Sequence, residues 1–597
     1  MTPLDYSIVA AYLALMVAIG VTLQKRASRN IDSYFLGERS MPWWALGASG
    51  MAGNVDVSGT MINVALVYAI GAAGFFIEIR GGIVLIMAFL MAFVGKWYRR
   101  AQVMTLAEWM EFRFGRTREG AMARLIMAIV VLLFTIAAIT MFSIGAGKFV
   151  GEFLGLPPLL GLSPDFWAAA IMIALATFYT VLSGLQGVVW TDVIQGGFIL
   201  VMILYICAIA LAQGPLPEQF LVSMPMNDGS FQAVAVSREA WSDVIPKWRL
   251  DLDPQSQYAI FNLFGVAIFF YLLKVFIEGS GGTGGYMAQR YFAARNDREA
   301  GLLSMFWIFL LSFRWPFIMA VAILGIHYGL THPTIPDPER VLPVVIRTYV
   351  PLGLRGLIVA GLMSAAMSTF VSIVNAGAAY WVKDIYQAFL RPQASAKQLL
   401  RHSRWSSVLI VVLGLLLSLN IANINQIWGW LTMSIGGGLV VPLFARWYWW
   451  RLNGWGFAAG MFGGAVAALL QLFFFTGLPE YTIFAWVSGV SLMAMLITTL
   501  LTPPTREAVL KHFYLTTHPF GWWGPIRSQL PQKEVAAIRS ETRRDLASAA
   551  LAVPWQLVLF LTGMCLVLRT WDTLYWLLAL LLLLSLALYR VWYRHLT

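Results

Sequence analysis

Long apolar stretches recur along the whole chain of 597 residues, and they constrain its fold more than any other feature. Apolar residues make up 59% of the chain and charged residues only 12%, against about 25% charged in a typical soluble domain. We therefore expect an all-α protein that crosses the membrane many times. A run of about 18 apolar residues spans a bilayer as a helix, and about fifteen such runs occur, near residues 5–24, 42–70, 76–97, 122–150, 164–183, 187–213, 256–280, 300–328, 352–382, 405–422, 425–447, 455–476, 481–501, 552–569 and 572–592.

The net charge of +12 follows the membrane topology and gives no sign of a nucleic-acid partner. Lys and Arg gather in alternate connections, near residues 25–39, 96–118, 290–298, 383–404 and 446–451. Cytoplasmic loops carry this excess of basic residues. The pattern predicts a protein of the cell membrane (the inner membrane in a bacterium), with its N-terminus outside and its C-terminus in the cytoplasm. Loop 214–255 should face out and loop 502–551 should face in.

Several classes of function lack their characteristic residues. The six His residues are scattered without metal-ligand spacing, and no phosphate-binding Gly-Lys-Ser motif occurs. Loop 502–551 is too short for a nucleotide-binding domain. Cys207 and Cys565 lie in apolar runs and are expected to be free thiols. Asp5 precedes the first run and no basic segment does, so this run is expected to be a retained helix rather than a signal peptide. We expect neither an enzyme nor an organic cofactor.

Two of the apolar runs are interrupted by glycine and polar residues. One interruption follows Trp43 and continues to Gly59, and the other covers residues 278–286. Glycine at this density disfavours a regular helix, although it also permits close helix packing. Paired broken helices in matching positions indicate a secondary transporter with inverted repeats. The predicted organisation is an N-terminal helix and loop (1–41), two five-helix repeats (42–213 and 256–447) separated by an outer loop (214–255), two peripheral helices (448–501), a cytoplasmic loop (502–551) and an accessory helical hairpin (552–597).

Three hydroxyl groups lie near the middle of the run 352–382. Ser368 and Thr369 are adjacent, and Ser372 follows one helical turn later. Neutral oxygens at membrane depth suit a small cation such as sodium. Serine and threonine in membrane helices also bond to their own carbonyls or to neighbouring helices, so this cluster alone does not decide.

Several short motifs, taken together in their order and spacing, resemble the sodium/solute symporter family, which includes sodium/glucose and sodium/proline cotransporters. The resemblance covers about residues 5–500 and implies inverted repeats of the leucine-transporter type, alternating access and sodium-driven uptake of a small organic solute. The motifs are Trp43-Trp44 with Ala52-Gly53-Asn54-Val55, Thr105 to Trp109 with Arg113-Phe114-Gly115, Gly184 to Gln195, Gln289-Arg290 and Met367-Ser368-Thr369 with Asp384-Ile385-Tyr386.

The resemblance assigns residues to a sodium site. Backbone carbonyls of Ala52 and Val55 would come from the broken first core helix, and the eighth core helix would supply the Ala365 carbonyl and the hydroxyls of Ser368 and Thr369. Such a shell of five neutral oxygens binds sodium weakly enough to release it.

Acidic residues within the apolar runs are the next candidates. Asp192, with Ser372, matches a position that in some family members supports a second sodium or the exit path. The alternative is that Asp192 caps the helix that begins near it. Asp56 reaches a cation or a substrate amine, or it caps a half-helix. Glu78 falls where some sugar transporters bind substrate, or it forms a Glu–Arg pair with Arg80 on the outer surface.

The solute is left open by the sequence. We list Asn54, Asp56, Glu78, Thr283 and Trp430 as substrate-binding candidates. A sugar or sugar derivative is the first expectation, because tryptophan faces and backbone groups are available in a cavity with few side chains. A carboxylate or an amino-acid-like solute is the second. A membrane sensor on the same fold is the alternative class, and a channel is disfavoured by the paired helix breaks. The expected partners are therefore the solute, sodium and membrane lipid.

Overall fold

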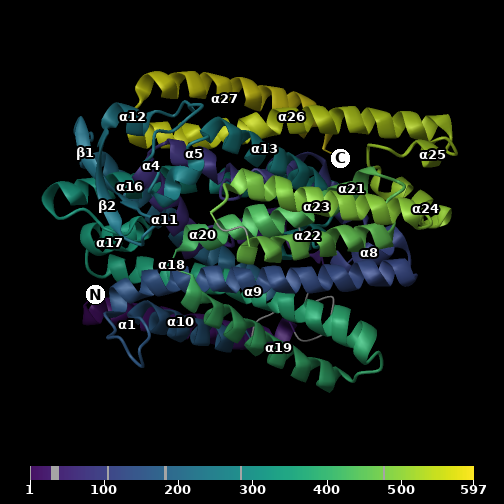
Figure 1. The fold of residues 1–597 in the computed structure, drawn as a ribbon, viewed down its shortest axis with the longest axis horizontal. Helices are drawn as coiled ribbons and strands as arrows, with labels where there is room; N and C mark the ends of the chain where they lie inside the picture. The colour runs from purple at the N-terminus through teal and green to yellow at the C-terminus, as the bar shows by residue number, and fades with distance from the viewer. Residues whose placement is uncertain are drawn as a thin grey trace.

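The computed structural model is a bundle of long helices that lie roughly side by side (Figure 1). It describes residues 2–27, 39–103, 106–180, 185–282, 285–421, 423–474 and 477–596. In this part of the chain, ten helices are long and apolar enough to cross a membrane, and three further apolar helices are shorter. The prediction of a helical protein with many membrane spans is confirmed.

Each predicted apolar run coincides with a helix or with a short series of helices. The region 42–213 contains α3 (Trp43–Ala52) with α4 (Val57–Ile70), α6 (Ile86–Phe89) with the π-helix η3 (Leu90–Val94) and α7 (Gly95–Arg100), α9 (Arg118–Leu154), α10 (Pro164–Thr180) and α11 (Leu185–Ala212). The short elements α5 (Ala73–Ile77), η2 (Glu78–Arg80) and α8 (Leu106–Phe114) connect them. These five groups correspond to the five helices predicted for this region.

The region 256–447 has a matching series. It contains α13 (Phe264–Gly281) with α14 (Gly285–Phe292), α15 (Asp297–Leu311) with α16 (Arg314–Thr331), α18 (Leu354–Ala379), α19 (Ala396–Leu417), and α20 (Ile424–Gly429) with the π-helix η8 (Trp430–Ile435) and α21 (Gly436–Tyr448). The first group of each series is interrupted, as the glycine pattern predicts. That the two series are related by inversion remains a prediction.

The first interruption lies between α3 and α4. Residues 53–56 separate the helices, and the Asp56 side chain accepts a hydrogen bond from the backbone N–H of Gly59 at 3.1 Å, so Asp56 caps α4. Close packing explains another part of the glycine pattern. A Cβ atom added at Gly50 would lie 2.3 Å from the Trp307 ring, which means that glycine lets α3 approach α15. Both interpretations of the glycines therefore apply, at different positions.

The second interruption follows α13, where Gly282 has a φ of 81°. A Cβ atom there would lie 2.4 Å from the Tyr98 hydroxyl, so both the backbone conformation and the available space require glycine. Thr283 lies outside the described residues.

The two large loops lie at opposite ends of the bundle (Figure 1). Loop 214–255 contains an antiparallel hairpin of β1 (Gln219–Pro225) and β2 (Phe231–Ser237), followed by α12 (Arg238–Ser242). Loop 502–551 contains α24 (Glu507–Thr517) and α25 (Gly524–Arg527). This placement matches the prediction that the two loops face opposite sides of the membrane, and which side is cytoplasmic remains a prediction.

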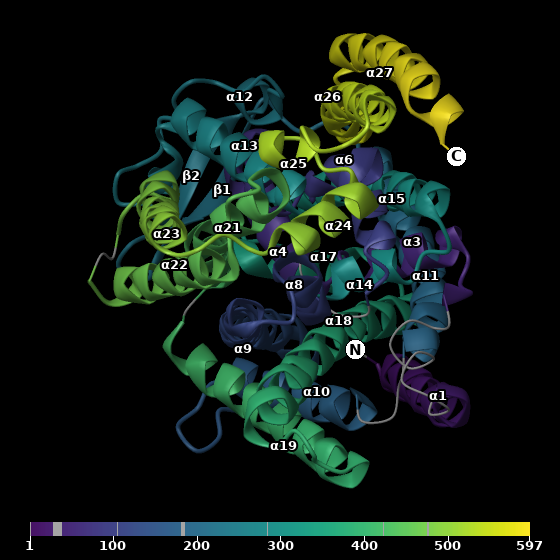
Figure 2. The same ribbon diagram turned by 90° about the vertical axis from the view of Figure 1, so that its right-hand side faces the viewer.

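The remaining long helices surround the two series. These are α1 (Pro3–Ala27), α22 (Gly454–Phe474), α23 (Glu480–Leu501), α26 (Gln532–Leu568) and α27 (Trp571–Val591). Helices α26 and α27 lie on the side of the bundle opposite α1 (Figure 2). Because α26 is continuous from Gln532, the boundary predicted between residues 551 and 552 falls inside this helix.

Candidate functional site

The first interruption and α18 meet at the predicted sodium site. The Thr369 hydroxyl, which is buried, donates a hydrogen bond to the carbonyl of Gly53 at 3.2 Å. Gly53 is the residue directly after Ala52 and two before Val55, so the predicted carbonyl ligands belong to the segment that Thr369 contacts. Helix ends leave carbonyls without helical partners. The structure thus places one predicted hydroxyl ligand in contact with the segment that carries the predicted carbonyl ligands.

For the other predicted ligands of α18, the structure shows only the helix to which they belong. Ala365 and Ser368 belong to α18, and their side chains lie outside the described part of the structure. Ser372 follows Ser368 by four positions on α18 and is partly buried.

Asp192 lies in a buried cluster with a serine and an arginine. Its Oδ2 accepts a hydrogen bond from the Ser49 hydroxyl at 2.6 Å and lies 3.7 Å from Nη2 of Arg290. Arg290 Nη2 also donates to Ser49 Oγ at 2.8 Å. The cluster joins α3, α11 and α14. Of these, α3 belongs to the first interrupted pair of helices and α14 to the second. Since α11 is already helical from Leu185, Asp192 lies about two turns inside it, and the helix-cap interpretation is wrong for this residue.

A second hydrogen-bonded chain extends from this cluster. The Arg290 guanidinium lies 5.9 Å from the centre of the Trp307 ring, a cation–π distance. The Trp307 indole N–H donates to Oδ1 of Asn54 at 2.8 Å. Asn54, a predicted substrate ligand, is therefore held on the α15 side of the first interruption.

Asp56 caps α4, which is one of the alternatives that the sequence leaves open, and it also faces a cation. A Cβ atom added at Gly59 would lie 2.7 Å from Asp56 Oδ1 and 3.2 Å from Nη2 of Arg314, so both side chains surround Gly59. Arg314 acts electrostatically on Asp56 and donates to the Gly82 carbonyl at 3.3 Å. Capping and charge pairing are combined in this one carboxylate.

Glu78 lies inside the protein and not on its outer surface. Glu78 is 1% exposed and Arg80 is 0% exposed, which contradicts the alternative of an interfacial pair. The two side chains do pair, since Oε1 of Glu78 accepts from Arg80 Nε at 3.1 Å and from Nη2 at 2.9 Å. The other oxygen, Oε2, accepts from the Trp428 indole N–H at 3.2 Å.

The structure adds Asn63 to the candidates. A Cβ atom at Gly82 would lie 2.1 Å from Glu78 Oε2 and 2.8 Å from Asn63 Oδ1, so the two oxygens face the same point. Asn63 is 1% exposed, and within the described residues its side-chain oxygen and nitrogen have no hydrogen-bond partner. A buried amide without partners is costly, so Asn63 is added as a candidate for a polar ligand. The sequence signal was an asparagine inside an apolar helix.

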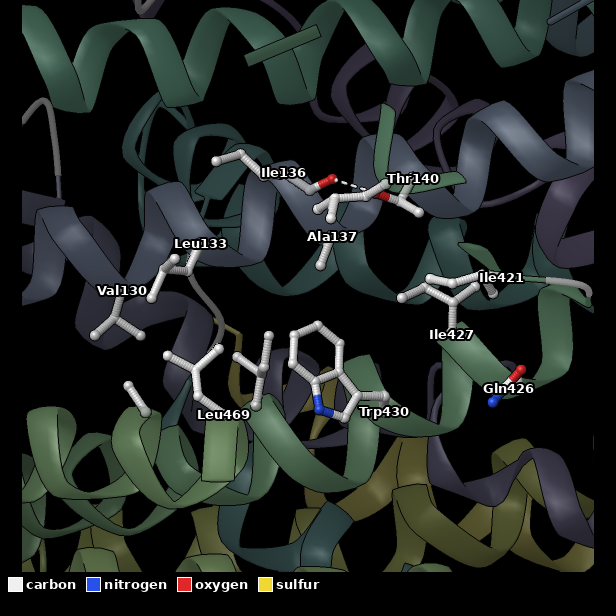
Figure 3. Close-up of a pocket in the computed structure, with 13 residues that line it drawn as sticks. Val130, Leu133, Ile136, Ala137, Thr140, Ile421, Gln426, Ile427, Trp430 and Leu469 are labelled. Carbon is white, nitrogen blue, oxygen red and sulfur yellow. Dashed lines mark hydrogen bonds between the residues drawn. The ribbon is translucent and has the colours of Figure 1, made fainter. Parts of the chain in front are cut away.

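Trp430 lies away from these residues. Its indole N–H donates to the Ala468 carbonyl at 3.3 Å. The ring lines a cavity of about 260 Å³ with α9 residues such as Val130 and Ala137 and with Leu469 of α22 (Figure 3). The cavity wall is almost wholly apolar, and the tryptophan that contacts Glu78 is Trp428, two residues earlier. Trp430 as a solute ligand remains a prediction.

The comparisons with known proteins decide the family. The family model described as the sodium:solute symporter family matches residues 34–464. The chain belongs to this family. Relatives of this symporter include a sodium/glucose cotransporter of Vibrio parahaemolyticus, 25% identical over 80% of this chain and 86% of the relative. A sodium/sialic acid symporter of Proteus mirabilis is 25% identical over 74% of this chain and 84% of the relative.

A solved structure shows the fold. A sodium-coupled sialic acid symporter in a substrate-bound, outward-open state aligns with a TM-score of 0.63 and 20% identity, covering 85% of this chain and 99% of that one. Membership identifies this symporter as a membrane transporter that couples a small organic solute to sodium. The predictions of a transporter rather than an enzyme and of sodium as the coupling ion are confirmed.

Proposed function

We propose that this symporter takes up a neutral, polyhydroxylated solute, a sugar or a sugar derivative, together with sodium held by Ala52, Val55, Ala365, Ser368 and Thr369. The observation that carries the solute class is the pairing of charge around Asn63. Arg80 has the carboxylates of Glu78 and Glu480 beside it. Lys274, which donates to the Arg80 carbonyl, has Glu278 at 2.7 Å.

This charge balance disfavours an acidic solute. Arg314 likewise faces Asp56. A solute carboxylate would therefore compete with a protein carboxylate for Arg80, Lys274 and Arg314, and it would also lie near the negative charge of Glu78. A hydroxyl group both donates and accepts a hydrogen bond, which matches the Asn63 amide, without a partner in the described part of the chain, beside the Glu78 oxygen. The flat Trp428 indole beside Glu78 offers an apolar surface for a sugar ring. Several relatives are named for solutes of this class, glucose, mannose and myo-inositol, whereas two are named for sialic acid.

Asp192 and Ser372 are proposed to act on the sodium path rather than on the solute. Asp192 lies in the interior beside both broken groups, at the cluster with Ser49 and Arg290. A carboxylate that exchanges between Arg290 and a passing cation would assist the release of sodium. The proposed topology places the N-terminus outside and the C-terminus in the cytoplasm, as the distribution of basic residues favours.

Uptake into proteoliposomes with an inward sodium gradient tests the solute class. The panel would contain neutral sugars and polyols, sialic acid, simple carboxylates and amino acids. We expect concentrative uptake of a neutral sugar or polyol, and about a tenfold higher half-saturation concentration in Asn63→Ala, because a hydrogen-bonding group is removed. Asn227→Ala, an exposed position in the hairpin turn of loop 214–255, is the matched control. Uptake of only acids or amino acids would contradict the proposal, and binding without transport would favour a sensor.

A further inference from the structure

The segment that carries Glu78 is irregular, although it lies deep in the protein. The short helix η2 ends at Arg80 and is followed by residues 81–85, in which Val84 has a φ of 54°, unusual for a β-branched residue. Irregular backbone at membrane depth depends on surrounding side chains for its hydrogen bonds. Two helices outside the predicted repeats supply side chains that contact this segment, one at the Arg80 side chain and one at the backbone.

Helix α23 supplies Glu480. This carboxylate accepts a hydrogen bond from Arg80 Nη1 and another from the Tyr271 hydroxyl at 2.8 Å. Arg80 therefore lies between Glu480 and Glu78. The remaining Arg80 nitrogens form a fork onto one Glu78 oxygen, Oε1, which leaves Oε2 facing Trp428 and Asn63.

Helix α26 supplies Gln556. Its side-chain nitrogen donates to the carbonyls of Ile83 and Val84, both at 3.2 Å, and the residue is fully buried. These carbonyls follow Gly82 directly, so Gln556 holds the backbone against which Glu78 Oε2 and Asn63 Oδ1 lie. The two accessory helices thus hold both ends of the segment 78–84.

We propose that Glu480 and Gln556 are positioning residues for the solute site, which makes the affinity for the solute depend on helices outside the two repeats. Glu480 fixes Arg80, and Arg80 in turn selects the Glu78 oxygen that is presented to the solute. Gln556 fixes the backbone beside it. The proposal rests on the proposed function, because it takes Glu78 and Asn63 as solute ligands.

The test compares Glu480→Gln and Gln556→Met with a matched control. Glu119→Gln is that control, because Glu119 also joins the core to an accessory helix, at the Gly454 N–H, but it does not contact the segment 78–84. The probes are tritiated D-glucose, D-mannose and myo-inositol in proteoliposomes. We expect the half-saturation concentration of the transported sugar to rise about tenfold in both test variants. The half-saturation for sodium and the maximal rate per folded molecule should stay within about twofold of wild type. Glu480→Asp should recover part of the affinity.

An unchanged sugar affinity in folded Glu480→Gln and Gln556→Met protein would overturn the proposal, as would an equal effect in Glu119→Gln. If wild-type protein takes up none of the three sugars, the proposed solute class fails, and a double-mutant cycle on thermal unfolding still tests the positioning. Glu78→Gln and Glu480→Gln should then shift the unfolding temperature non-additively because they share Arg80. Additive shifts would overturn the proposal.

Discussion

At the scale of single residues, Thr369 links the two halves of the proposed sodium site. Its hydroxyl donates to the Gly53 carbonyl, and this contact joins a helix interruption to α18. When all ligands are neutral oxygens, no formal charge compensates for the loss of one, so each ligand contributes strongly to the affinity for sodium.

We expect Thr369→Ala to raise the sodium concentration for half-maximal uptake about tenfold, because one hydroxyl ligand is removed. Ser368→Ala should have an effect of the same direction, and Thr369→Ser should remain near wild type because it keeps the hydroxyl. The measurement is uptake against sodium concentration in vesicles. If both alanine variants retain the wild-type sodium affinity, the sodium site has been assigned to the wrong residues.

We expect Asp192 to influence sodium coupling through its negative charge. Asp192→Asn keeps the shape but leaves the buried Arg290 without its carboxylate, so we expect altered sodium coupling and about tenfold weaker sodium dependence in protein that still inserts into the membrane. Asp192→Glu should be milder. In Asp192→Asn/Arg290→Gln the folded amount should recover while the coupling should not. Wild-type sodium dependence in folded Asp192→Asn would exclude an electrostatic role.

The sequence predicted the site residues unevenly, and helix geometry explains why. Trp428 and Trp430 are two positions apart, so on a helix they point in nearly opposite directions, and the register was not readable from the sequence. Glu480 reaches Arg80 only through a contact between segments that are far apart in the sequence. That Asn63 faces Glu78 depends on how the chain folds back at Gly82. The hydroxyls of α18 and the first interruption were predictable because each is a local departure from an apolar run.

At the scale of elements, α18 receives its N-terminal cap from α1. Oδ1 of Asp5 accepts hydrogen bonds from the N–H groups of Gly353 at 2.8 Å and Gly356 at 3.0 Å. Gly353 stands at the N-cap position and has no side chain to do this itself. The helix that carries the proposed sodium ligands is therefore held at its start by the N-terminal helix.

We expect Asp5→Ala to lower the free energy of unfolding by about 1 kcal/mol, the usual cost of losing a cap. Asp5→Asn should cost less, since asparagine also caps helices. Unfolding temperature in detergent is the measurement, and Ser7→Ala, an exposed position on the same helix, is the control. A shift in Asp5→Ala no larger than in Ser7→Ala would show that the cap contributes little.

Hydropathy predicted the long apolar helices because it measures length and apolar content, which are local properties. It did not show that α26 extends from the bilayer region back to Gln532, because the first half of this helix is polar. That half is held by long-range ion pairs instead. Lys96 of α7 lies 2.7 Å from Glu541 and 2.8 Å from Asp545.

At the scale of the whole molecule, the two loop regions occupy opposite ends of the bundle (Figure 1). The distribution of basic residues favours the proposal that the hairpin end faces the outside. Asp228→Cys in the hairpin turn and Lys533→Cys at the start of α26 are both exposed positions. A membrane-impermeant maleimide should label the first in intact cells and the second only after permeabilisation. The reverse pattern would invert the topology.

The most direct test of the central claim is sugar accumulation driven by sodium alone. Purified protein in proteoliposomes would receive tritiated D-glucose, D-mannose or myo-inositol with an inward sodium gradient or with the same gradient of potassium. We predict accumulation above the external concentration with sodium, a collapse of that accumulation when an ionophore dissipates the gradient, and only background uptake with potassium. Equal uptake under the two gradients would contradict sodium-coupled symport by this chain.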